Sequence, residues 1–224
     1  VEPHFPVLFV SAMKVIIFGA NGLLGQYAWK CALEAGHEVT AFVRSPDKLD
    51  KDDPKFEQLQ VVTGDVMDAD AVKLACGGHD VVISCVSPAG GTPTIDMAKS
   101  IVTNAMASGV QQFYMVGGCG VLWVEGTNKT VMLKDKEGMP EGLQKASKGH
   151  ILSLEFMETT GLTQYTFLCP GKMTDGPANP NCIVKLDEFV EGGFKASLGS
   201  CAKAIVDDLG VGQHFGHRVC VAEP

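Results

Sequence analysis

The segment Lys14-Val-Ile-Ile-Phe-Gly-Ala-Asn-Gly-Leu-Leu-Gly25 predicts a buried strand, a glycine-rich turn and the start of a helix. Val15–Phe18 is a short apolar run with β-branched residues, which is typical of a parallel strand covered on both faces. Gly19, Gly22 and Gly25 then recur at every third residue. Such glycines permit a tight turn, close approach of the backbone to a pyrophosphate, and close contact between helix and sheet. The free N–H groups at the start of the next helix would hold the diphosphate.

The context of the three glycines favours a nucleotide site over a turn that serves packing alone. An amphipathic helix is predicted over Gln26–Glu34, ended by Ala35-Gly36, and a second strand over His37–Val43. Because the helix joins two neighbouring strands as a crossover, the strands should be parallel.

The second predicted strand ends at Arg44-Ser-Pro-Asp-Lys48. Residues at this position indicate whether the site prefers NAD or NADP. An acidic side chain about 20 residues beyond the glycines suits the ribose of NAD, whereas an arginine nearby suits the 2′-phosphate of NADP. Arg44, with Ser45 and Lys48 beside it, therefore favours NADP(H). A solvated surface arginine is the alternative.

The remaining pattern alternates strands and helices, which indicates a single α/β domain with a doubly wound, mostly parallel sheet of the Rossmann type. We predict strands at 58–63, 80–86, 112–116, 163–169, 182–186 and 217–222, and helices at 69–76, 94–107 and 143–159. Ser200 is expected to cap a last helix through Leu209. Residues 122–142 lack periodicity and predict a long surface loop that covers the site.

Two aspartates follow the third predicted strand. Asp65 stands at a strand end, where open α/β sheets bind ligands, so its carboxylate could accept a hydrogen bond from the adenine amino group. A role as a cap is its alternative, and Asp68 is expected to be the N-cap of the next helix. Cys85, Val86 and Ser87 follow the fourth strand and should line the cofactor channel.

The chain has 224 residues, which is enough for one substantial core. Residues 1–12 are expected to form an extension outside the fold. Residues 13–224 would form the NAD(P)-binding domain, with its substrate side built from about 117–142 and 170–200. No apolar run approaches the roughly 20 residues that cross a bilayer, so no membrane partner is expected.

Charge and cysteine usage exclude other classes of protein. With 18 basic and 26 acidic residues, the net charge of −8 disfavours a nucleic-acid partner. The eight cysteines show neither a CxxC pair nor a metal-ligand spacing, which predicts reduced thiols in a cytoplasmic protein without a bound metal. A monomer or a weak homodimer is expected.

Several of these segments together resemble a known family. Gly19–Gly25, Val43–Lys48, Gly64-Asp65 and Cys85-Val-Ser87 look like the atypical short-chain dehydrogenase/reductase group with an NAD(P)-binding, NmrA-like fold. Within this group, three further segments are similar in order and spacing to the biliverdin-IXβ/flavin reductases: Val121-Leu-Trp123, His150–Leu162 and Cys169–Asp175.

The resemblance implies that NADPH reduces a planar conjugated acceptor, such as a flavin, a quinone or a linear tetrapyrrole, by hydride transfer. It also implies the residues that contact the cofactor or the substrate. These are Gly19, Asn21, Gly22, Leu23, Leu24, Gly25, Arg44, Ser45, Lys48, Asp65, Val66, Cys85, Val86, Ser87, Gly117, Gly118, Pro170, Gly171 and Met173.

The chain departs from the family at the groups that would donate a proton. Gly118 stands where the family has a serine, and Lys172 where it has a histidine. Gln144 precedes Lys148 by four residues, so the tyrosine of ordinary short-chain dehydrogenases is missing. Lys172 and His150 are the candidate catalytic groups. The alternative for Lys172 is a phosphate contact or an ordinary loop lysine, and the alternative for His150 is a structural role.

Three functions remain open from the sequence. A reductase of planar acceptors fits best, because charge in such acceptors delocalises and water can supply the proton. The missing donors also permit an NADP(H)-binding sensor of the NmrA-like type without catalysis. An epimerase of nucleotide sugars is disfavoured by the short C-terminal part.

Overall fold

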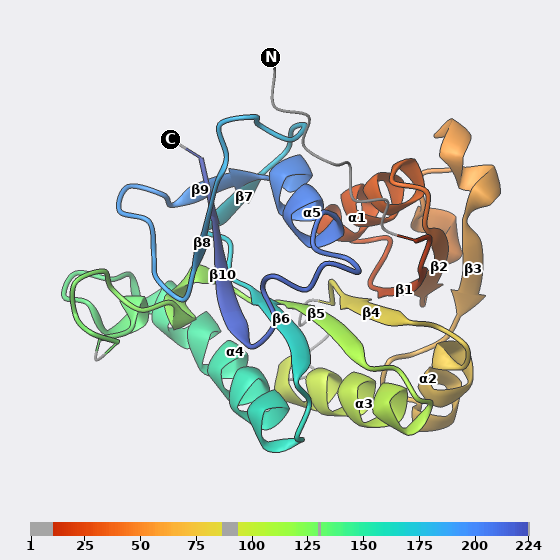
Figure 1. The fold of residues 1–224 in the computed structure, drawn as a ribbon, viewed down its shortest axis with the longest axis horizontal. Coiled ribbons are helices and arrows are strands. Elements are labelled where there is room, and N and C mark those ends of the chain that lie inside the picture. Colours follow the sequence, from red (N-terminus) through yellow and green to blue (C-terminus); the bar gives the residue numbers. More distant parts are fainter. Residues whose placement is uncertain (1–10, 87–93, 130, 224) are drawn as a thin grey trace, which may run out of the picture.

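The computed structural model describes residues 11–86, 94–129 and 131–223 (Figure 1). Within these residues, eight strands form one sheet in the order β3-β2-β1-β4-β5-β6-β10-β8. All neighbours are parallel except β8, which runs antiparallel to β10. The strands are β1 (Lys14–Phe18), β2 (Glu38–Val43), β3 (Gln60–Thr63), β4 (Val81–Ser84), β5 (Gln112–Val116), β6 (Gln164–Leu168), β8 (Ile183–Leu186) and β10 (His217–Ala222).

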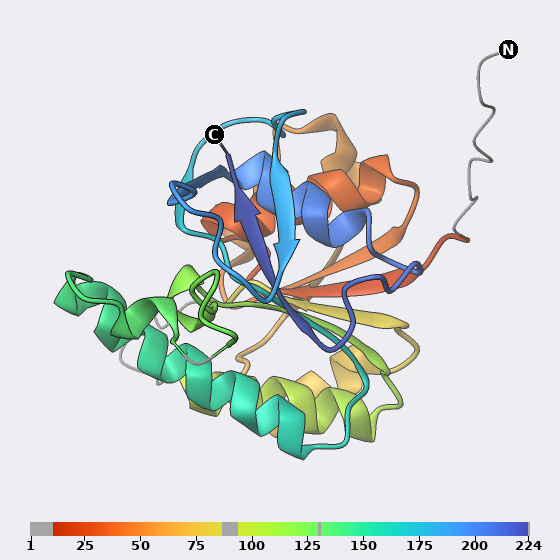
Figure 2. The same cartoon turned by 60° about the vertical axis from the view of Figure 1, so that its left-hand side comes forward.

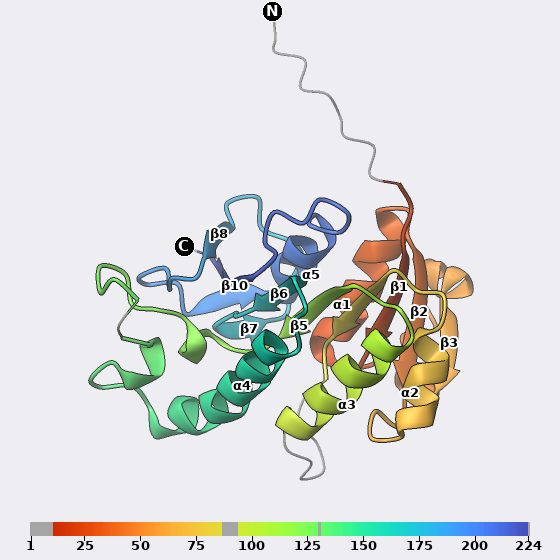
Figure 3. The same cartoon turned by 60° about the horizontal axis from the view of Figure 1, so that its bottom comes forward.

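Helices cover both faces of this sheet, as Figure 2 shows. One face carries α1 and α5, and the other carries α2, α3 and α4 in succession (Figure 3). The helices are α1 (Leu23–Glu34), α2 (Ala69–Cys76), α3 (Thr94–Ala107), α4 (Glu141–Thr159) and α5 (Leu198–Val206). None of the helices in the described ranges is both long and apolar enough to cross a membrane.

Strand β1 lies inside the sheet, between β2 and β4, and contributes side chains to the two hydrophobic cores on opposite faces of the sheet. Val15 and Ile17 pack with α1 and α5, whereas Ile16 and Phe18 pack with the opposite helices, and all four are fully buried. This alternation follows from the two-residue period of a strand. It confirms that the apolar run is covered on both faces.

The strand order reverses between β1 and β4, which both pair with their neighbours in parallel. In an open α/β sheet, such a reversal leaves a crevice outside the carboxyl ends of the strands, where ligands bind. The doubly wound, mostly parallel sheet predicted from the sequence is confirmed.

Several predicted elements differ from the structure at their boundaries, and the last helix ends at Val206 and not at Leu209. Helix α5 begins at Leu198 and its N-cap is Ser197, whose side chain accepts a hydrogen bond from the amide of Ser200; Ser200 is therefore not the cap. The predicted third strand begins at Gln60, because Pro54–Gln58 forms a short 3-10 helix capped by Asp53. Asp68 caps α2 as predicted.

A small two-stranded sheet was not predicted. Strand β7 (Lys172–Thr174) pairs in parallel with β9 (Lys195–Ser197), close to α5 and β10 (Figure 1). Each strand has three residues, which is too short to show a period of two in the sequence.

The irregular segment before α4 is anchored to the rest of the fold. Leu122 and Leu133 are buried, and the amide of Trp123 donates to the carbonyl of Asp187 at 2.9 Å. The amide of Phe189 donates in return to the carbonyl of Trp123 at 2.8 Å. These contacts tie the segment to the chain that follows β8.

Candidate nucleotide-binding site

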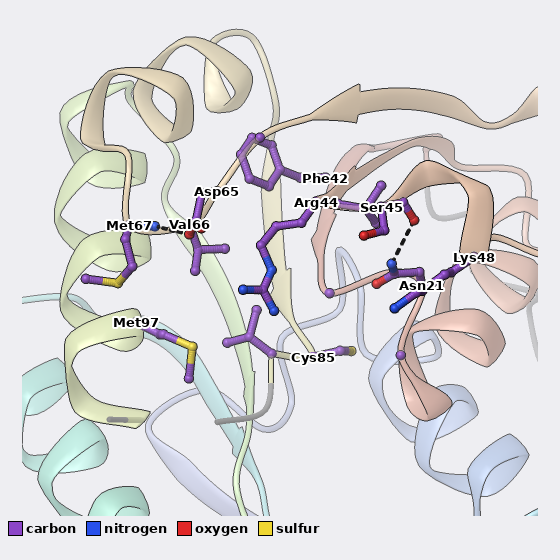
Figure 4. Close-up of a pocket in the computed structure, with 15 residues that line it drawn as sticks. Asn21, Phe42, Arg44, Ser45, Lys48, Asp65, Val66, Met67, Cys85 and Met97 are labelled. Atoms are coloured by element: carbon purple, nitrogen blue, oxygen red, sulfur yellow. Dashed lines mark hydrogen bonds between the residues drawn. The ribbon is translucent and has the colours of Figure 1, made fainter. Parts of the chain in front are cut away.

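A cavity of about 280 Å³ opens at the carboxyl ends of β1, β2, β3 and β4 (Figure 4). It lies at the reversal of strand order. Ten of the predicted cofactor-contacting residues line it, together with five that were not among the predicted contacts. The lining residues are Gly19, Asn21, Gly22, Phe42, Val43, Arg44, Ser45, Lys48, Gly64, Asp65, Val66, Met67, Cys85, Val86 and Met97.

The turn after β1 requires glycine at its first position. Gly19 has φ +75°, and a Cβ there would lie 2.9 Å from the carbonyl oxygen of Cys85. The amide of Gly22 donates to the carbonyl of Gly19 at 2.9 Å and closes the turn, after which Gly22 is the N-cap of α1. The backbone therefore forms the floor of the cavity without a side chain above it.

The first turn of α1 presents free amides next to this floor. Within the described residues, the N–H groups of Leu23, Leu24 and Gly25 have no hydrogen-bond partner. Unpaired amides and the helix dipole together favour an anion at this end of a helix. The arrangement suits the diphosphate of a dinucleotide.

The side chains of three predicted cofactor contacts, Leu23, Leu24 and Gly25, lie outside the cavity lining. Leu23 is 78% exposed at the start of the helix, whereas Leu24 is buried in the core. A Cβ at Gly25 would lie 2.2 Å from the carbonyl oxygen of Gly19. Gly25 therefore allows α1 to pack against the turn, and the side chains of these residues do not line the cavity.

The loop after β2 is held against α1 by two side-chain amides. Asn21 donates from Nδ2 to the carbonyl of Ser45 at 3.0 Å, and Gln26 donates from Nε2 to the carbonyl of Lys48 at 2.9 Å. Arg44 extends from this loop into the cavity (Figure 4). Within the described residues, neither Arg44 nor Lys48 forms an ion pair, so both cations are available to a ligand.

The opposite wall combines a carboxylate with apolar side chains. Asp65 accepts a hydrogen bond at Oδ1 from the amide of Met67 at 2.9 Å, and its Oδ2 has no partner among the described residues. Val66, Met67 and Met97 line the same side of the cavity (Figure 4). Asp68 is the N-cap of the next helix, and Asp65 caps only the turn before it through the Met67 amide.

Of the five lining residues that were not predicted, Phe42, Val43 and Met97 depend on tertiary contacts. Phe42 and Val43 end β2, and a Cβ at Gly64 would lie 2.5 Å from the Phe42 ring. Position after a strand was a usable signal for Gly64 and Met67. Met97 comes from the first turn of α3, and nothing local in the sequence marks it.

A second group of predicted contacts gathers at the ends of β5 and β6, outside this cavity. The amide of Gly117 donates to Leu168 at 2.7 Å, and the amide of Cys119 donates to Pro170 at 2.9 Å. Gly118 lies between these two bonds. Gly171, Lys172 and Met173 continue from Pro170 into β7, and Ser87 lies outside the described residues.

The two candidate catalytic residues have different surroundings. A Cβ at Gly118 would lie 3.1 Å from Nδ1 of His150, so the imidazole packs directly on this backbone. Burial lowers the pKa of His150 below its ordinary value, which keeps the ring neutral at pH 7. Lys172 is exposed on β7, and its amide donates to the carbonyl of Phe194 at 2.6 Å. Gln144 and Lys148 are exposed on α4.

The cysteines of the described residues provide neither a disulfide nor a metal site. All eight cysteines are free, and desolvation raises the pKa of Cys85 beside the cavity to about 12, so its thiol is protonated at neutral pH. Across the described ranges, no cluster of histidine, cysteine and carboxylate side chains has the arrangement of a metal site.

A family model for NAD(P)H-binding proteins matches residues 19–209. The chain belongs to this NAD(P)H-binding family. The match includes the glycine turn, the loop of Arg44 and both groups of predicted contacts. Family membership therefore agrees with the geometry of the cavity.

Individual relatives extend over nearly the whole chain. The uncharacterized protein YwnB of Bacillus subtilis is 26% identical over 220 residues, which cover 93% of this chain and 98% of YwnB. A candidate NADH-flavin reductase from Streptococcus pneumoniae has a TM-score of 0.79 and 28% identity, over 95% of this chain and all of its own. A candidate epimerase from Bacteroides thetaiotaomicron has a TM-score of 0.81 and 28% identity, over 95% and 97%.

Substitution of Gly25 by Ala tests whether α1 must pack on the glycine turn. The added Cβ would meet the Gly19 carbonyl at 2.2 Å, so the helix start must move away from the floor of the cavity. We expect a lower melting temperature and at least a tenfold weaker affinity for both NADH and NADPH, measured by calorimetric titration.

Gly142→Ala is the matched control, because a Cβ there meets nothing within 4 Å at the start of α4. This variant should keep both affinities. Unchanged binding in Gly25→Ala would contradict the role given to the helix start.

Proposed function

We propose that the protein is an NADPH-dependent reductase that transfers a hydride to a planar conjugated acceptor, such as a flavin, a quinone or a tetrapyrrole-like compound. The observation that carries this proposal is the contact of the His150 imidazole with the backbone of Gly118, beside the ends of β5 and β6. The cavity opens at the carboxyl ends of β1 to β4, and β5 pairs with β4, so the reactive end of a dinucleotide bound in the cavity would extend toward this place.

The groups near Gly118 favour an acceptor that makes little demand on a protein acid. Reduction of a carbonyl needs a proton donor close to the developing alkoxide. Gln144 stands at the position of the usual tyrosine, and Lys148 is exposed to solvent. In a flavin or quinone the negative charge delocalises, so a weak donor or water is sufficient. The motifs described above support a place among the atypical, NmrA-like short-chain reductases.

The cofactor would be held in three places by this chain. The amides of Leu23 and Leu24 would bind the diphosphate, and Arg44 with Lys48 and Ser45 would bind the 2′-phosphate. Asp65 would accept a hydrogen bond from the adenine amino group at its free oxygen. When bound, the reduced nicotinamide supplies the hydride.

Replacing Arg44 by Ala tests the choice of cofactor. The guanidinium has no carboxylate partner in the described residues, so its loss removes a ligand contact and leaves the fold intact. We expect the affinity for NADPH to fall by about ten- to hundredfold and that for NADH to stay within twofold, because only NADPH carries the phosphate.

Lys51→Ala serves as a control, since this exposed lysine lies three residues beyond the Lys48 end of the loop. Both affinities should remain at the wild-type value in this variant. An equal loss of NADH and NADPH affinity in Arg44→Ala would show that the arginine does not read the 2′-phosphate.

We assign His150 the role of proton donor to the reduced acceptor, with water as the substitute. Because burial lowers its pKa, the imidazole gains a proton only below its ordinary value near 6.5. Turnover of NADPH with flavins or quinones should therefore increase as the pH falls from 8 to 5. His150→Gln should flatten this profile and lower kcat about tenfold at the acidic end.

Steady-state loss of nicotinamide absorbance measures this profile, with Glu155→Gln on the exposed side of α4 as the control that retains it. Absence of turnover by the wild-type protein with every flavin and quinone would contradict the proposed reductase and favour a nucleotide sensor. An unchanged pH profile in His150→Gln would contradict only the role of the histidine.

A further inference from the structure

The small sheet beside the site places two lysines next to each other. In the parallel register of β7 and β9, Lys172 lies directly opposite Lys195. Neighbouring strands are about 4.8 Å apart, so two side chains at one register position extend close together on the same face. Both lysines are exposed. Two ammonium groups in this arrangement repel each other unless an anion lies between them.

Neither lysine is neutralised by the protein itself. Lys30, Lys185 and Lys203 each pair with a carboxylate at 3.2 Å or less. Within the described ranges, Lys172 and Lys195 have no such pair, although the chain carries 26 acidic residues and a net charge of −8. The two lysines therefore lie side by side without an ion-pair partner among the described residues, on a protein of net negative charge.

The position of β7 brings this pair close to the reactive end of the cofactor. At its start, β7 follows Pro170, whose carbonyl accepts a hydrogen bond from the amide of Cys119, three residues beyond the end of β5. Just past its end, Asp175 accepts a hydrogen bond from the Tyr27 hydroxyl of α1 at 2.7 Å. The strand thus extends from the neighbourhood of Gly118 to the second turn of α1.

The negative groups of NADPH already have partners elsewhere. The first turn of α1 presents amides for the diphosphate, and Arg44 with Lys48 lies at the adenosine end of the cavity. The pair on β7 and β9 is therefore left for a different anion. The acceptor is the other ligand that must enter this part of the site.

An exposed aromatic residue adjoins β9 in the chain. Phe194 precedes Lys195, is 41% exposed, and packs its ring on buried Phe189 with 4.6 Å between the centroids. Its backbone also lies against Gly171, where a Cβ would meet the Phe194 carbonyl at 2.4 Å. An exposed ring that packs on a buried ring offers a flat apolar surface to a planar ligand.

We propose that Lys172 and Lys195 bind an acidic group of the acceptor, a phosphate or a carboxylate, while its conjugated rings lie toward Phe194 and Gly118. The proposal rests on the proposed reductase function and narrows its substrates to planar acceptors with an anionic side chain. It also assigns Lys172 to substrate binding and not to proton donation.

A pair of flavins that differ by one phosphate tests this site. The wild-type protein should have a lower KM for flavin mononucleotide than for riboflavin. In the double variant Lys172→Gln/Lys195→Gln, the KM ratio of riboflavin to flavin mononucleotide should fall by about five- to tenfold, because two exposed charge contacts are lost. KM for NADPH should stay within twofold.

Lys145→Gln is the matched control, because Lys145 is an exposed lysine on α4 that pairs with Glu141 at 2.7 Å. This variant should keep the wild-type ratio. Quenching of flavin fluorescence gives the same comparison as dissociation constants, so the anion site is tested even in the absence of turnover. The absence of turnover would count against the reductase function alone.

Three outcomes would overturn the proposal. Equal affinities of the wild-type protein for the two flavins would show that it does not recognise the phosphate. A rise in KM for NADPH in the double variant would assign the lysines to the cofactor. An equal loss of kcat with both flavins in the double variant would assign the lysines to the chemical step and not to recognition of the phosphate.

Discussion

The close approach of helix α1 to the turn after β1 is the constraint on which the site depends. Gly25 has no Cβ and thereby allows the helix to pack within contact distance of the Gly19 carbonyl. The approach aims the unpaired amides of the first helical turn at the carboxyl edge of the sheet, next to a floor of bare backbone. An anion can bind there without any charged side chain, because the amides and the helix dipole act in its place.

Side-chain hydrogen bonds hold the cationic residues Arg44 and Lys48 at the carboxyl edge of the sheet. Asn21 and Gln26 hold the loop that carries Arg44 and Lys48 against α1. These two cations form no ion pair within the described residues, as is also true of Lys172 and Lys195 across the strand ends. A net charge of −8 repels anionic ligands at a distance, so recognition of phosphate must depend on such local positions.

The parts of the fold that sequence predicted are those determined by local patterns. The run Val15–Phe18, the glycines at a spacing of three and the cap at Asp68 each depend on neighbours within a few residues, and the structure confirms them. Met97 and the three-residue strands β7 and β9 depend on contacts between distant segments, which leave no period in the sequence. Ser197 was missed as a cap because β9 continues directly into α5, so no polar turn separates them.

The contact between His150 and Gly118 also arises from tertiary structure, because it joins α4 to the end of β5. A crystal structure of the complex with NADPH is the most direct test of dinucleotide binding at the start of α1. We predict the diphosphate within hydrogen-bond distance of the amides of Leu23 and Leu24, with the 2′-phosphate against the Arg44 guanidinium. A diphosphate bound away from the start of α1, or a 2′-phosphate that does not contact Arg44, would contradict it.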